Sequence, residues 1–260
     1  MQIRIISSGS KGNSMLFRAG DMYGMVDAGL TLRALTPRLE EAGVPFRGLD
    51  HILVTHGHLD HARSAGALAK RHHATVHCPE AMMQNRSVAR APRLSNTSDG
   101  MDTELLGEHG DKVRLQAVAL PHDCHPTLAY KLTHDDRCLV VLSDIGRPDR
   151  QVAQRLSGAH VLMLEFNHCT EMLEAGPYPD SLKRRVGGDQ GHLSNEQSQE
   201  MLTWLAGENL HTLVLTHLSA KNNQPEIALN CAMETLDKLG LSHIKVLIAK
   251  QEESLEPIQV

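Results

Sequence analysis

The sequence predicts an α/β protein built as a four-layer αββα sandwich, and two observations lead to this prediction. Short apolar, β-branched segments alternate with helical segments along the chain, and they fall into two strand-rich halves. No low-complexity tract or long linker interrupts the 260 residues, which suffice to bury one large core. We therefore expect residues 1–260 to form a single domain.

The first half should open with three strands that form an antiparallel meander. The Gly/Ser/Asn-rich run at 7–13 predicts the turn between the first two of them, and Gly43 is a helix stop signal. In chain order we expect strands at 2–6, 14–18 and 22–26, a helix at 32–42, a strand at 51–55, and helices at 61–72 and 79–90.

The second half should contain strands whose ends are followed directly by polar residues, which is how a rigid sheet presents functional side chains. We expect strands near 112–119, 127–133 and 138–143, a helix at 149–156, a strand at 160–165, helices at 179–186 and 194–206, a strand at 211–216, a helix at 225–239 and a strand at 244–249.

Residues 55–61 read Thr-His-Gly-His-Leu-Asp-His and follow an apolar strand segment. Alternate residues of an extended chain point to the same side, so His56 and His58 can converge on one cation, while Asp60 and His61 can turn toward a second. Imidazole and carboxylate are ligands that zinc accepts and that manganese or iron tolerate. The chain has 17 histidines, so a His-rich surface loop is the alternative. The order of residues directly after a strand favours two metal ions.

The motif Thr-His-x-His-x-Asp-His resembles the signature of the metallo-β-lactamase fold superfamily. That signature continues with a lone His, an Asp that bridges both metals and a final His, and the chain supplies a match to each where an apolar run ends. Asp144 could instead be a helix N-cap. The resemblance implies the αββα fold and two divalent ions, with zinc as the default and manganese or iron as alternatives. It implies His56, His58 and His122 for the first metal, Asp60, His61 and His217 for the second, and Asp144 as the bridge.

Further segments resemble one bacterial branch of that family, the YycJ or WalJ-like proteins. They are Ser7-Ser-Gly-Ser-Lys-Gly-Asn-Ser14, Leu164-Glu-Phe-Asn-His168, Gly176-Pro-Tyr-Pro179, Leu182-Lys-Arg-Arg-Val186, Gly191-His-Leu-Ser-Asn195 and Leu215-Thr-His-Leu-Ser219. The branch has Asn-His-Asp where this chain has Asn167-His168-Cys169, which leaves a chemical role for Cys169 in doubt. The resemblance implies a metal-dependent phosphodiesterase that acts on DNA as a 5′-to-3′ exonuclease, with hydroxide formed at the dinuclear site as the nucleophile.

Gly191-His-Leu-Ser, followed by Leu215-Thr-His-Leu-Ser, also resembles the corresponding region of the nuclease tRNase Z. In that family a His outside the metal shell donates a proton to the departing oxygen, and His192 is the matching position. His168 could orient His192 or contact the substrate, and a structural role is the alternative for both residues. Asp60 or Asp144 could accept or steer the proton of the attacking water.

Charge and composition set the remaining expectations. The net charge of −5 does not by itself indicate a nucleic-acid binder, but Lys183, Arg184 and Lys221 are candidates to hold backbone phosphates, with a solvated helix face as the alternative. Five widely spaced cysteines without a Cys-x-x-Cys pair favour reduced thiols and a cytoplasmic location. No apolar run long enough to span a membrane, no signal peptide and no obligate protein partner are expected.

Two other classes of function stay open. A small-molecule hydrolase of the glyoxalase II or lactonase type would use the same metals on a thioester or a lactone, but it gives no reason for the Gly191-His-Leu-Ser segment. A non-catalytic metalloprotein would bind DNA or a partner without turnover, and the intact ligand set argues against it.

Overall fold

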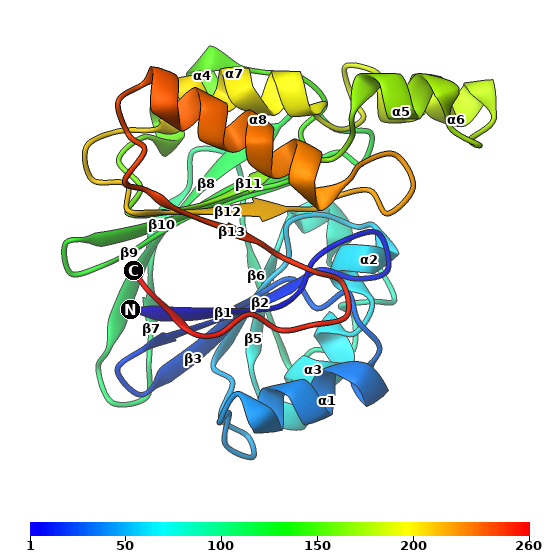
Figure 1. Cartoon of the computed structure of the whole chain (residues 1–260). Helices are drawn as coiled ribbons and strands as arrows, with labels where there is room; N and C mark the ends of the chain where they lie inside the picture. Colours follow the sequence, from blue (N-terminus) through cyan, green and yellow to red (C-terminus); the bar gives the residue numbers. More distant parts are fainter.

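Two seven-stranded β-sheets face each other in the computed structural model, which describes residues 1–260 (Figure 1). Helices α1 and α3 cover the outer face of one sheet, and helices α4, α7 and α8 cover the outer face of the other. Three apolar clusters fill the spaces between these layers: one lies between the sheets and one lies under each set of helices. The predicted αββα sandwich is confirmed. No helix is long and apolar enough to cross a membrane.

The first sheet is antiparallel at one side and parallel at the other. Its order is β14-β1-β2-β3-β4-β5-β6, and pairing becomes parallel from β3 onward. Its strands are β1 (Gln2–Ser7), β2 (Ser14–Ala19), β3 (Met22–Val26), β4 (His51–Leu53), β5 (Thr75–Cys78), β6 (Arg93–Asn96) and β14 (Ile258–Gln259). The helices of this half are α1 (Leu32–Glu41), α2 (Leu59–Ala62) and α3 (Ala65–His72).

The second sheet follows the same plan, with the order β13-β12-β11-β10-β9-β8-β7 and parallel pairing from β10 onward. Both halves thus run from antiparallel to parallel in chain order, a repeat that the sequence did not reveal. The strands are β7 (Asp102–Leu106), β8 (Lys112–Leu120), β9 (Thr127–His134), β10 (Arg137–Leu142), β11 (Val161–Glu165), β12 (Thr212–Thr216) and β13 (Lys245–Ile248). The helices are α4 (Arg150–Leu156), α5 (Thr170–Ala175), α6 (Asp180–Val186), α7 (Asn195–Leu205) and α8 (Pro225–Lys238).

The predicted helix over 79–90 is wrong. Only a single 3-10 turn forms there, at Glu80–Met82, and the chain then continues through turns. The side chain of Asn85 accepts a hydrogen bond from the backbone N–H of Ser87, which is the local competition with helix that Asn offers. The short strands β5, β6 and β7 and the short helix α5 were not expected either.

Several parallel strands end at the same edge, where the two sheets bring their carboxyl ends together. In open α/β sheets this edge is where ligands bind. Asp27, Asp144 and His217 follow β3, β10 and β12, and all three have a left-handed backbone with φ of 60°, 59° and 56°. Such backbone is uncommon for residues other than glycine and clusters at functional sites. The edge is therefore the place to look for chemistry.

Candidate metal centre

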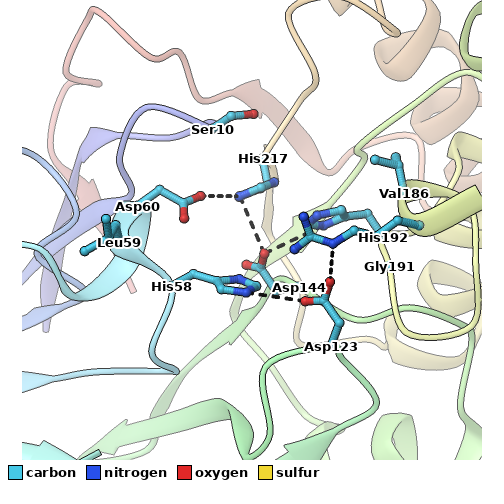
Figure 2. A pocket seen from close by; sticks show the side chains of 11 residues that line it. Ser10, His58, Leu59, Asp60, Asp123, Asp144, Val186, Gly191, His192 and His217 are labelled. Carbon is cyan, nitrogen blue, oxygen red and sulfur yellow. Dashed lines mark hydrogen bonds and ion pairs between the residues drawn. The ribbon is translucent and has the colours of Figure 1, made fainter. Parts of the chain in front are cut away.

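The two predicted ligand trios lie next to each other at this edge. In each trio the potential ligand atoms lie within 4.8 Å of one another; the trios are His56, His58 and His122, and Asp60, His61 and His217. Asp144 lies between them. Its Oδ2 is 3.2 Å from His61 Nε2, and its Oδ1 is 3.6 Å from His217 Nε2 and 3.9 Å from His122 Nε2. Figure 2 shows His217 between Asp60 and Asp144, joined by dashed lines to both carboxylates. The structure brings all seven predicted ligand residues together.

The turn after β4 places the first two histidines as the alternating pattern predicts. His56 Nε2 and His58 Nδ1 are 3.0 Å apart, so the two rings converge on one point. Asp60 and His61 lie on α2, which begins one residue after His58 and turns their side chains to the second cluster. His122 and His217 come from the loops after β8 and β12.

The imidazoles are fixed by hydrogen bonds on the nitrogen that faces away from the centre. His122 Nδ1 donates to the carbonyl oxygen of Gly191 (2.9 Å), and His61 Nδ1 donates to Asp27 Oδ2 (2.7 Å). These bonds aim each Nε2 at the centre, where it offers a lone pair once the ring is neutral. The Nε2 atoms of His122 and His217 are buried and have no hydrogen-bond partner. Buried ring nitrogens that converge without a partner are what a bound cation satisfies, so these residues fit a metal centre.

The buried carboxylates and imidazoles of the site shift one another's pKa values. Burial alone raises the pKa of Asp144, but the imidazoles of His217 and His61 outweigh this and hold that pKa well below its usual range. Burial likewise lowers the pKa of His61, but Asp144 and Asp27 raise it to about 9. Burial also lowers the pKa of His217, but Asp144, Asp60 and Glu165 raise it to about 10. The buried carboxylates therefore demand positive charge at the centre, from protons or from metal ions.

A hydrogen-bonded pair of a histidine and a glutamate lies beside the two trios. His192 Nδ1 donates to Glu165 Oε1 (2.7 Å), and Glu165 Oε2 accepts the backbone N–H of Ile145 (3.1 Å). Glu165 is fully buried, and the His192 ring stacks on that of His217 with centroids 5.1 Å apart. His168 makes no hydrogen bond to His192, so the expectation that His168 orients this ring is not met, and Glu165 occupies that position instead.

Sequence reasoning thus missed Glu165 and Asp27. The signal for both was present, since each is a carboxylate directly at the end of an apolar strand, as Asp144 is. Nothing in the residues themselves marks these two carboxylates as partners of histidines.

A cleft of about 330 Å³ opens onto the centre. It is lined by Ser10, His58, Leu59, Asp60, Asp123, Asp144, Arg185, Val186, Gly191, His192 and His217 (Figure 2). None of the three predicted phosphate contacts lines it. Lys183 and Arg184 line a second hollow of about 750 Å³ together with His168, and Lys221 lies over the ring of Tyr178 at 5.5 Å. In the cleft beside the ligand trios, which we call the metal cleft, the Lys or Arg side chain is Arg185.

Comparisons with known proteins agree with this arrangement. The family model described as the β-lactamase superfamily domain matches residues 25–218, which include both ligand trios. The chain belongs to the metallo-β-lactamase superfamily. Zinc-bound PqqB from Methylobacterium extorquens has the same fold, with a TM-score of 0.72 at 12% identity over 98% of this chain and 100% of that one.

Within the superfamily the chain is similar to the YycJ and WalJ proteins, as its motifs predicted. It is 31% identical over 226 residues to exodeoxyribonuclease WalJ of Streptococcus pneumoniae serotype 2, covering 86% of this chain and 84% of that one. It is 27% identical over 245 residues to exodeoxyribonuclease YycJ of Bacillus anthracis, covering 92% and 90%. The resemblance drawn from the motifs is confirmed.

Proposed function

We propose that this superfamily member is a metal-dependent phosphodiesterase that acts on DNA, as a 5′-to-3′ exonuclease. The observation that carries the proposal is the Glu165–His192 pair beside the two ligand trios. The similarity to two proteins named exodeoxyribonucleases supports DNA as the substrate. Ligand residues from both sheets meet at one centre, so we propose that residues 1–260 act as one domain.

The two trios and Asp144 would hold two divalent ions, of which zinc is our first expectation and manganese or iron the alternatives. When bound, the ions would supply a nucleophile at neutral pH and polarise the phosphoryl group. Asp60, which is only partly buried, borders the cleft and can accept a proton there.

His192 supplies the proton that the departing oxygen requires. Its Nδ1–H is held by Glu165, which leaves Nε2 free toward the cleft. A sugar oxygen is a poor leaving group as an anion, and protonation by a positioned imidazole typically gives about 10²–10⁴-fold in rate.

The same pair weighs against a thioester substrate. A thiol has a pKa of about 8.5 and leaves readily as the thiolate, so a thioester hydrolase gains little from a second proton donor. An ester whose alcohol oxygen departs gains the full benefit. We therefore favour a phosphodiesterase over a thioester hydrolase of the glyoxalase II type.

Lys183 and Arg184 would contact phosphates further along the strand, in the hollow that they share with His168. Because Lys183 Nζ already donates to the carbonyl oxygen of Glu174 (2.6 Å), Arg184 is the freer of the two. Lys221 lies outside both hollows and would contribute through its charge alone.

We predict that metal binding at pH 7 releases protons. In the metal-free protein the pKa values of His61 and His217 are raised to about 9 and about 10, so both rings are protonated at pH 7, whereas a metal ligand must be neutral. Metal affinity should accordingly increase as the pH rises toward these values. A pH indicator in weakly buffered solution measures the release. His217→Gln should release fewer protons than the wild type, and an equal release would contradict this origin.

The decisive test of the proposed function is a cleavage assay on purified protein loaded in turn with Mn²⁺ and Zn²⁺. Substrates are end-labelled duplex DNA, single-stranded DNA, structured RNA and S-lactoylglutathione, and Asp144→Asn controls for contaminating nucleases. We expect nucleotides to be released from the 5′ end of DNA, and not by the variant. Thioester hydrolysis with inert nucleic acids would refute the proposal.

A further inference from the structure

The last turn of α6 carries three consecutive basic residues that line two different hollows. Successive residues on a helix point about 100° apart, so neighbours in sequence face different surroundings. Lys183 and Arg184 line the hollow beside His168, while Arg185 and Val186 line the metal cleft. Arg185 is thereby the Lys or Arg side chain that reaches the space beside the candidate metal ligands.

Asp123 holds Arg185 at this position. The guanidinium Nε donates to Asp123 Oδ2 (2.5 Å), and the backbone N–H of Asp123 donates to the carbonyl oxygen of Gln190 (2.9 Å). The other carboxylate oxygen, Oδ1, lies 3.4 Å from both His58 Nε2 and His122 Nε2. Asp123 therefore places the guanidinium next to the first ligand trio.

The guanidinium keeps donors for a ligand. Arginine has five N–H groups in a planar fork, and Nε is the one held by Asp123. The side chain is 59% exposed although it is anchored, so its terminal nitrogens are open to the cleft. The other charged groups that line the cleft, apart from its histidines, are the carboxylates of Asp60, Asp123 and Asp144, which repel an anion.

We propose that Arg185, anchored by Asp123, binds a non-bridging oxygen of the substrate's phosphate and positions the phosphodiester over the metal centre. This inference rests on the proposed function and specifies the substrate class as an anionic diester. A thioester or a lactone has no charged oxygen at its reacting centre that would pair with this guanidinium. The planar shape of the guanidinium matters as well as its charge, because Nε donates to Asp123 while the terminal nitrogens donate to the phosphate.

The test compares Arg185→Ala and Arg185→Lys with the wild type. Arg114→Ala is the matched control, because Arg114 also pairs with an aspartate, Asp102, and is 57% exposed, but lies outside the cleft. The readouts are kcat and KM on DNA, and equilibrium binding of a fluorescent single-stranded oligonucleotide to metal-free protein as a function of salt.

We expect Arg185→Ala to lower kcat, and with it kcat/KM, roughly 10- to 100-fold, as for loss of a hydrogen bond to a charged group. The slope of log affinity against log salt should shrink by about 0.7, the contribution of one phosphate contact on a single strand. Arg185→Lys should restore the salt slope but not kcat, and Arg114→Ala should match the wild type in both.

Unchanged kcat/KM for Arg185→Ala in an enzyme that cleaves DNA would overturn this inference and leave the proposed function intact. Full rescue of kcat by lysine would also overturn it, since charge alone would then suffice. A wild type that does not cleave DNA would refute the proposed function, and the binding measurement would then decide on Arg185: an unchanged salt slope refutes the contact and a reduced slope supports it.

Discussion

Replacing His192 with alanine should lower turnover on DNA by about 10²–10⁴-fold and leave the metal content unchanged. His192 lies outside both ligand trios and beside them, with its Nδ1 on Glu165 and its ring against His217. Its removal takes away the proton for the departing oxygen without taking a ligand from the predicted metal sites. Steady-state kinetics and elemental analysis on the same preparation measure both quantities.

Glu165→Gln gives the companion variant. Glutamine keeps the shape of the side chain but removes the charge that Glu165 presents to His192 Nδ1, so turnover should fall, though less than in His192→Ala. A leaving group that needs no proton, such as p-nitrophenolate, should restore turnover in His192→Ala. Unchanged turnover on DNA in His192→Ala would return this residue to a structural role.

The sequence predicted the residues of the candidate metal centre more fully than the elements around them. His56, His58, Asp60 and His61 lie within six positions, so strand and turn geometry alone bring them together. His122, Asp144 and His217 could be placed only because a known motif supplied their order. Each lies at the end of a strand, and the parallel arrangement of those strands carries the three residues to one edge.

Other features depend on tertiary contacts that no local pattern reveals. Asp27 and Glu165 gain their importance from histidines that lie 34 and 27 residues away along the chain. The region 79–90 has a composition suited to helix, yet it packs through turns because Ser87 offers its carbonyl oxygen to Gly66 of α3. The sequence predicted phosphate contacts for Lys183 and Arg184 and not for Arg185. Only the orientation of α6 in the fold shows that Arg185 faces the metal cleft and that the other two face the second hollow.

Replacing Asp144 with asparagine should reduce both the bound metal and the turnover, and turnover on DNA should fall to the background of the assay. Asp144 is the carboxylate that approaches imidazoles of both trios, and it is 2% exposed. Asparagine preserves its volume and tolerates the left-handed backbone at φ 59°, which alanine tolerates less well. The variant therefore removes charge from the centre with little change to the fold.

Metal per chain, measured by elemental analysis after dialysis against a chelating resin, tests this directly, with Asp102→Asn as a surface control that should keep its full content. Loss of the Asp144 charge also removes the largest influence that raises the pKa values of His61 and His217, so fewer protons should be released when metal is added back at pH 7. Full metal content in Asp144→Asn would mean that the two trios hold their ions independently, and the residue would then act only by balancing the charge of its histidine neighbours.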